Sequence, residues 1–233
     1  MQISFLLFPQ VTQLDMTGPA QVLSRMPGAK LELVAKTLDP VPTDAGFALL
    51  PTATFASAAQ PDILCVPGGF GVTRAMEDDA TLSWLRDVAE GAQWITSVCT
   101  GALVLGAAGL LRGYRATTHW ASHEFLAAFG AIPVKERVVF DRNRATGGGV
   151  TAGIDFGLAL VAAIEGADYA RFVQLSLEYD PAPPLDSGSP DKAGAATLER
   201  YRAMVAKHAA DRPARYRAAA EKMKAAAGPS PRP

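Results

Sequence analysis

Three short, almost entirely apolar runs place the strongest constraint on the fold of this chain. They cover residues 3–8, 62–66 and 94–98, and a continuous apolar run is typical of a strand buried on both faces. Helices are expected between and after them, at residues 80–90, 120–129, 151–165 and 167–177. Because strands that alternate with helices form a mostly parallel sheet covered on both sides, the sequence predicts an α/β fold.

The remaining elements are expected to be shorter. Strands are predicted at residues 30–36, 47–50, 115–118, 134–140 and 144–146, with a turn at 141–143. A helix is predicted to open at Gly18-Pro19, because proline is favoured at the first helical position. Residues 180–189 are rich in Pro, Asp and Ser, which is typical of a surface linker.

The segment after the linker differs from the rest of the chain in charge. From Lys192 onward ten Lys and Arg residues stand against three Asp and Glu, although the whole chain has a net charge of -1. Residues 195–227 are predicted to form an Ala-rich helix interrupted at Pro213. We expect its basic face to be solvated; contact with an acidic partner or a second subunit is the alternative. The segment does not show the paired short helices of a helix-turn-helix, so no nucleic-acid partner is expected.

The length and composition of the chain limit the classes of protein to which it can belong. A chain of 233 residues with 49% hydrophobic residues can form one large domain with a substantial core. Two cysteines do not make a disulfide framework, no apolar run reaches membrane-spanning length, and the N-terminal residues lack the basic region of a signal peptide. We therefore expect a cytoplasmic protein without a membrane partner.

Cys99 lies at the turn between the apolar run 94–98 and a helix of small residues that follows it. The first free N–H groups of that helix would point at the sulfur, and their field favours the thiolate, which is the nucleophilic form. Gly101 would let the backbone turn sharply, as in a nucleophile elbow. Cys99 is therefore the candidate nucleophile, whereas Cys65 lies inside an apolar strand and is expected to belong to the core.

Other candidate site residues follow the ends of predicted strands, where the active sites of open α/β sheets lie. Asp15 precedes the helix expected at Gly18-Pro19, too early to cap it, and is the acid that we expect near Cys99. Gly68-Gly69 allows a close approach of the backbone, and its N–H together with that of Thr100 could stabilise a developing negative charge.

His119 and His123 are four residues apart, with Glu124 beside them. On an α-helix this spacing would place two metal ligands on one face, but no third ligand is evident, so no metal site is expected. His119 could instead act as the base that activates Cys99.

Several motifs together resemble those of the DJ-1/PfpI superfamily, and within it the bacterial isocyanide hydratases. The resemblance spans residues 2–190. In chain order the motifs are Leu14-Asp15-Met16-Thr17-Gly18-Pro19, Pro67-Gly68-Gly69, Ser97-Val98-Cys99-Thr100-Gly101, Arg115-Ala116-Thr117-Thr118-His119-Trp120 and Thr146-Gly147-Gly148-Gly149-Val150-Thr151-Ala152-Gly153-Ile154-Asp155.

The resemblance implies a flavodoxin-like three-layer sandwich, a homodimer and a cofactor-free hydro-lyase that converts an isocyanide into an N-substituted formamide. It implies Cys99 as the nucleophile and Asp15 as the acid. Gly69 and Thr100 match positions that line the anion pocket, and Gly148 and Val150 match a loop that borders the site. Residues 1–190 would be the catalytic domain, and 191–233 a helical extension of the same unit.

Two differences from other members of this superfamily narrow the range of possible functions. Thr100 stands where PfpI-like proteases have a histidine, which argues against a protease, and the related transcription regulators add a DNA-binding module that residues 191–233 do not show. A DJ-1-like glyoxalase or deglycase, and a non-enzymatic sensor whose Cys99 is oxidised to the sulfenic or sulfinic acid, are the alternatives to the hydratase.

Overall fold

A mostly parallel sheet of seven strands forms the centre of the computed structural model, which describes residues 1–226 except the side chains of residues 208 and 209. Only its edge strand runs antiparallel to its neighbour. In spatial order the strands are β10 (Val138–Asp141), β11 (Arg144–Gly147), β7 (Trp94–Val98), β6 (Ile63–Val66), β1 (Gln2–Leu6), β2 (Lys30–Ala35) and β5 (Ala53–Thr54). The predicted α/β class is confirmed.

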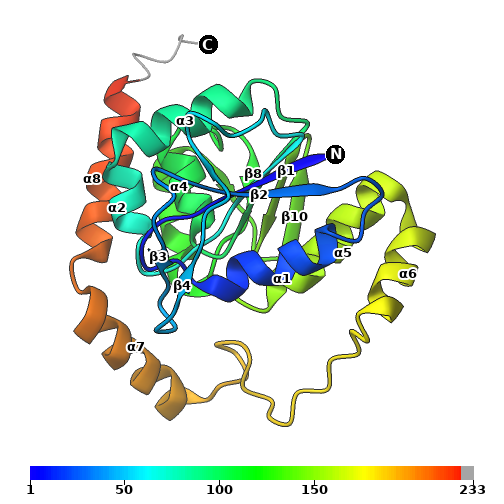
Figure 1. Cartoon of the computed structure of the whole chain (residues 1–233). Helices are drawn as coiled ribbons and strands as arrows, with labels where there is room; N and C mark the ends of the chain where they lie inside the picture. The colour runs from blue at the N-terminus through cyan, green and yellow to red at the C-terminus, as the bar shows by residue number, and fades with distance from the viewer. Residues whose placement is uncertain (227–233) are drawn as a thin grey trace.

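Helices cover both faces of this sheet, as expected for a flavodoxin-like sandwich (Figure 1). On one face α1 (Gln13–Leu23) packs along α5 (Ala152–Glu165), which also contacts α6 (Ala167–Ser176). The other face carries α2 (Val72–Glu77), α3 (Asp79–Ala89), α4 (Gly101–Ala107), the 3-10 helix η1 (Trp120–Phe129) and α8 (Arg212–Ala226). Helix α7 (Ala195–Ala209) precedes α8, and two small sheets, β3 (Val41–Pro42) with β4 (Ala48–Leu49) and β8 (Arg115–Ala116) with β9 (Ile132–Pro133), complete the fold.

The first helix begins earlier than the sequence predicted. Helix α1 starts at Gln13, so Asp15 lies in its first turn and Pro19 lies inside the helix. The prediction that this helix opens at Gly18-Pro19 is therefore wrong. A proline inside a helix removes one backbone hydrogen bond, here to the Asp15 carbonyl, but Pro19 packs tightly against Gly153 of α5. Packing between two helices far apart in the sequence outweighs the local preference for proline at a helix start.

The basic C-terminal segment is only partly solvated. Its break before Pro213 is confirmed, with α7 and α8 on either side, while residue 227 lies outside the described chain. Helix α8 buries Tyr216, Ala219, Ala220 and Met223 against α2, α4 and η1. On its other side Arg215 and Lys222 pair with Glu77 and Asp79. Part of the basic face of α8 is thus paired with acidic residues of the chain's own α2–α3 region, although these side chains remain exposed to solvent.

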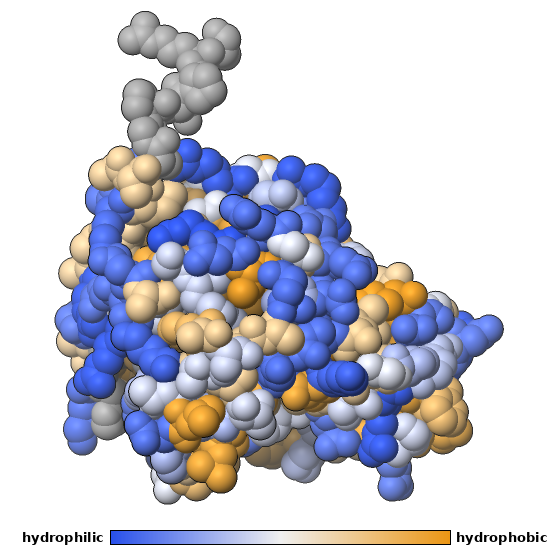
Figure 2. All heavy atoms as spheres, turned by 45° about the horizontal axis from the view of Figure 1, so that its top comes forward, coloured by the Kyte–Doolittle hydropathy of each residue, from blue (hydrophilic) through white to orange (hydrophobic). Residues whose placement is uncertain are grey.

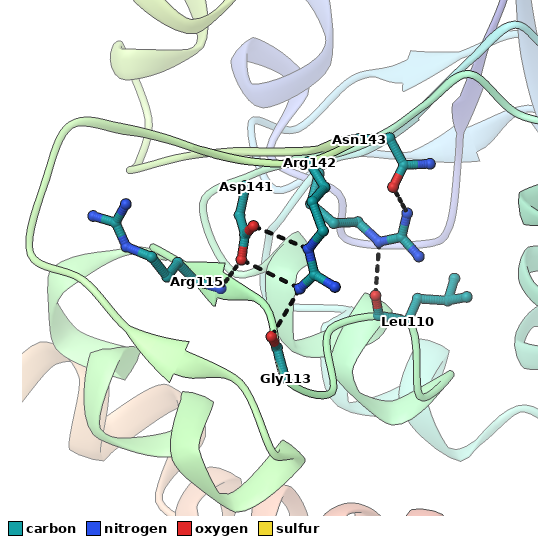
Figure 3. Close-up of polar contacts among 7 residues, drawn as sticks. Leu110, Gly113, Arg115, Asp141, Arg142 and Asn143 are labelled. Carbon is teal, nitrogen blue, oxygen red and sulfur yellow. Dashed lines mark hydrogen bonds and ion pairs between the residues drawn. The ribbon is translucent and has the colours of Figure 1, made fainter.

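Strand β11 is anchored beside the end of α4 by two arginines (Figure 3). Arg144 is 8% exposed, and its Nε donates to the Leu110 carbonyl at 2.8 Å while its guanidinium lies 4.4 Å from the Tyr114 ring centroid. Arg142 also lies over this ring and donates to the Gly113 carbonyl. These contacts fix the strand whose end, Gly147, leads into the glycine-rich loop at the functional site.

Hydrophobic side chains fill the core, and hydrophilic side chains cover most of the surface that Figure 2 shows. Cys65 is buried, as predicted, but it accepts a hydrogen bond from the Thr96 hydroxyl at 3.2 Å, so its surroundings are not purely apolar. Figure 2 shows a largely hydrophilic face on which hydrophobic side chains form separate patches. In residues 1–226, no helix is both long enough and apolar enough to cross a membrane.

Candidate active site

Cys99 lies where β7 ends and α4 begins, in a backbone conformation that a residue with a side chain rarely adopts. Its φ is 57°, and strain of this kind persists only where the surroundings hold it. The Cys99 N–H donates to the carbonyls of Gly147 and Gly148 at 3.1 Å, and the Thr118 hydroxyl donates to its carbonyl at 2.7 Å. A side chain at Gly101 would collide with the Val66 carbonyl, which explains the glycine predicted for this turn.

Asp15 reaches Cys99 from the first turn of α1. Its side chain is 1% exposed, and its Oδ2 accepts the Gly68 N–H at 3.1 Å. Gly68 has to lack a side chain, because a Cβ there would stand 2.9 Å from Asp15 Oδ2 and 2.6 Å from the Thr100 nitrogen. The structure thus brings Asp15 and Cys99 together, although 84 residues separate them in the chain.

Burial controls the ionisation of this pair. It raises the pKa of Asp15 to about 7, with the Cys99 side chain and the Gly68 N–H acting in the opposite direction. Burial, followed by the charge of Asp15, raises the pKa of the Cys99 thiol well above its usual value, although the Thr100 N–H favours the thiolate. The helix N-terminus favours the thiolate as expected, but burial and the charge of Asp15 outweigh it. Above about pH 7 the two groups therefore hold one proton between them, and they do not lose it readily because two negative charges cannot share this dry site.

The residues expected to line an anion pocket lie around Cys99, but their hydrogen bonds differ from those expected. The Gly69 N–H donates to the Thr100 hydroxyl at 3.1 Å, so it does not point freely into the site, while the Thr100 N–H faces the sulfur. The Gly148 carbonyl accepts a hydrogen bond from the Cys99 N–H. Val150, like Cys99, lines the cavity described below. All four residues predicted around Cys99 lie at the site, and their geometry assigns Thr100 the donor role.

His119 lies beside the site but is poorly suited to act as a base. Burial, and then the charge of Arg212, lowers its pKa to about 4, so the imidazole is neutral. Its Nδ1 accepts the Ala121 N–H at 3.3 Å, which leaves the proton on Nε2. His119, which lines the cavity, is therefore a neutral hydrogen-bond donor.

The possible metal pair does not form. His119 precedes η1, and in a 3-10 helix residues four apart point in different directions, so His123 does not share its face. Within the described residues, no cluster of three or more His, Cys, Asp or Glu side chains is arranged to hold a metal ion.

A cavity of about 730 Å³ opens above Cys99. One wall is aromatic: the Trp120 and Tyr201 rings lie 4.8 Å apart between centroids, and His119 packs against both. The lining also includes Phe70, Val150, Arg212 and Tyr216. Three of these residues, Tyr201, Arg212 and Tyr216, come from the C-terminal segment and were not predicted. A signal for them was present, because two tyrosines interrupt an otherwise Ala-, Arg- and Lys-rich segment.

Gly149 is a further site residue that the sequence predictions missed, although its glycine-rich loop was noted. A Cβ at this position would stand 2.8 Å from the Cys99 sulfur and 2.5 Å from His119 Cδ2. We expect Gly149→Ala to fold normally and to lower kcat/KM by about tenfold or more, because it displaces the sulfur. Gly188→Ala, on an open surface loop, is the matched control. Full activity in Gly149→Ala would show that the sulfur tolerates displacement.

Comparison with known proteins agrees with this geometry. The model of the DJ-1/PfpI family matches residues 1–163. The isonitrile hydratase of Pseudomonas putida is 57% identical over 206 residues, which are 88% of this chain and 90% of that protein. The crystal structure of a THiJ/PfpI family protein from Pseudomonas syringae has a TM-score of 0.89 and 47% identity over 94% of this chain and 90% of that one.

A transcription regulator is a more distant relative. The HTH-type transcriptional regulator CdhR of Pseudomonas aeruginosa is 37% identical over 51% of this chain, but the match covers only 35% of the regulator. The family model covers well over half of the chain, and the fold and the cysteine turn agree with it, so this protein belongs to the DJ-1/PfpI family.

Proposed function

We propose that this protein is an isocyanide hydratase, a hydro-lyase that adds water to R–NC and releases the N-substituted formamide. Isonitrile and isocyanide are two names for the same functional group. The observation that carries the proposal is the 57% identity to an isonitrile hydratase over nearly the whole of both chains. The Cys99–Asp15 pair beneath the large cavity supports it, because it offers a nucleophile and a proton donor at one point.

In the first step the Cys99 sulfur attacks the terminal carbon of the isocyanide. The shared proton lies on Asp15 when the sulfur is ionised, and this tautomer is the reactive one. As the carbon–sulfur bond forms, the carbon gains carbanion character and takes the proton from Asp15. The product is a thioimidate, Cys99–S–CH=N–R, beside an ionised Asp15. The low dielectric of the site strengthens this transfer because no bulk water competes for the proton.

In the second step water adds to the thioimidate carbon. Asp15, now ionised, accepts a proton from the water and passes it to the nitrogen, which gives Cys99–S–CH(OH)–NH–R. Collapse of this adduct forms the formamide carbonyl, expels the sulfur and returns the hydroxyl proton to Asp15. The pair is then back in its starting state, and one water has been consumed for each isocyanide. Thr100 N–H would stabilise negative charge on the sulfur as it leaves.

An assay with a panel of isocyanides tests the proposal. Loss of isocyanide absorbance and formation of the formamide by mass spectrometry should both be seen with the wild type. Methylglyoxal turnover without isocyanide turnover would instead indicate a glyoxalase. Absence of both, together with stepwise oxidation of Cys99 by mild peroxide in intact-mass spectra, would indicate a redox sensor.

We further propose that the enzyme is a cytoplasmic homodimer that works without a metal. The dimer rests on the family membership, and the absence of a metal requirement rests on a mechanism in which protein groups alone handle every proton. We expect light scattering to give twice the chain mass of 24.5 kDa and EDTA to leave turnover unchanged. A monomer mass would remove the first claim, and inhibition by EDTA that zinc reverses would remove the second.

A further inference from the structure

The part of the cavity formed by the C-terminal segment carries a cation that has no acidic partner. Arg212 begins α8 and lines the cavity. Its Nη2 donates to the Gly69 carbonyl at 3.3 Å, and its guanidinium carbon lies 4.7 Å from the Phe70 ring centroid. Within the described chain no Asp or Glu lies within ion-pair distance of it, whereas Arg215, one turn along the same helix, is paired with Glu77. Its charge therefore remains available to the cavity.

A buried hydroxyl beside this cation also lacks a partner. Tyr216 is 1% exposed and lines the cavity, and its hydroxyl makes no hydrogen bond of normal length within the described residues, although the Ser122 hydroxyl is close enough to lower its pKa. A buried hydroxyl without a partner is costly, and in a ligand cavity it is a ready donor for a group that is absent from the free protein. Ser122, 5% exposed, lines the same part of the cavity and adds a second hydroxyl.

These groups and the sulfur line one cavity, and their charges act on one another. The charge of Arg212 lowers the pKa of His119 and acts in the same direction on Tyr201 and Tyr216, although burial raises the pKa of both tyrosines. The charge of Cys99 raises the pKa of both tyrosines as well. A ligand bonded to the sulfur can thus extend along the aromatic wall toward Arg212.

We propose that Arg212, Tyr216 and Ser122 form a subsite for a carboxylate on the substituent of the isocyanide, so that the preferred substrates are isocyano acids. This inference rests on the proposed hydratase activity and names its substrate class. A guanidinium and hydroxyl donors are the groups that bind a carboxylate by charge-assisted hydrogen bonds. The acids at the lining, Asp44 and Glu124, are not paired with Arg212 and would repel a carboxylate placed elsewhere in the cavity.

The test compares ω-isocyanoalkanoates of increasing chain length with their methyl esters, which differ only in the charge. For the best chain length we expect the wild type to favour the acid over the ester by roughly tenfold to a hundredfold in kcat/KM, mostly through KM, as for a hydrogen bond to a charged group. In Arg212→Met the acid-to-ester ratio should fall to about one. Arg212→Lys should retain part of the preference, and Tyr216→Phe should reduce it by several-fold.

Arg215→Met is the matched control, because it removes a cation from the same helix outside the cavity and should leave the ratio unchanged. A wild type that hydrates acid and ester equally would overturn the subsite, as would an unchanged ratio in Arg212→Met. Failure to hydrate any isocyanide, a neutral cyclic one included, would overturn the proposed function and the subsite together. Hydration of neutral isocyanides without preference for the acid would overturn the subsite alone.

Discussion

Cys99→Ala is expected to abolish isocyanide hydration, with a loss of about 10³-fold or more, while the protein keeps its fold. The sulfur is the only heavy atom of the protein that forms a bond to the substrate carbon in the proposed mechanism, and no neighbouring group can replace it. A loss of 10³-fold corresponds to about 4 kcal/mol of transition-state stabilisation. Alanine fits the space, because Cys99 is held through its backbone by Gly147, Gly148 and Thr118.

The controls for this variant separate chemistry from stability. Cys65→Ala removes the other thiol, which lies in the sheet and whose pKa burial raises to about 12, so activity should persist with some loss of stability. Circular dichroism and thermal unfolding establish that both variants are folded. Intact-mass spectra of the wild type with a slow isocyanide should show the thioimidate adduct on Cys99. Turnover above a few per cent of wild type in Cys99→Ala would rule out Cys99 as the nucleophile.

Asp15→Asn is expected to lower kcat by about 10²–10⁴-fold, the usual range for loss of a general acid, with a smaller effect on KM. Asparagine has the size of aspartate and still accepts the Gly68 N–H, but it has no acidic proton to give to the substrate carbon. Asp15→Glu keeps the proton and moves it by one methylene into a site that is already full, so it should also lose much of the rate. Near-wild-type turnover by Asp15→Asn would exclude this role and make His119 the next candidate donor.

The pH profile gives an independent measure of the same pair. The reactive pair holds one proton, so kcat/KM of the wild type should rise with pH through about 7, the pKa to which burial raises Asp15. In Asp15→Asn the remaining activity should rise only in the alkaline range, because burial alone holds the thiol protonated. A rise at the same pH in both proteins would assign the titration to another group.

The stability of the folded protein should decrease as the pH rises, because of Asp15. The folded pKa of Asp15, about 7, lies above its ordinary value of 3.8, so the folded state binds the proton more tightly than the unfolded state. The free energy of unfolding of the wild type should therefore fall as pH rises from about 4 to about 7, relative to Asp15→Asn. The pKa difference sets the change between these two pH values at roughly 3 kcal/mol, to be measured by urea unfolding at both.

The sequence by itself determined the elements and much of the site. The apolar runs at β1, β6 and β7 marked the buried strands, and the turns after them marked Cys99, Gly68-Gly69 and the loop at Gly147. These signals are local, because each depends on a few adjacent residues. The carboxyl ends of parallel strands then meet at one edge of the sheet, so residues predicted separately are brought to one site.

Only the tertiary structure decided the start of α1, the proton balance of the site and the outer wall of the cavity. Helix α1 includes Pro19 because α5 packs against it. Desolvation by the whole surrounding chain, rather than the local helix end, sets the pKa of Cys99. Tyr201 and Arg212 reach the cavity from more than 100 residues beyond Cys99. All three depend on contacts between distant segments, and these contacts determine both how ionisable the sulfur is and which substrate it meets.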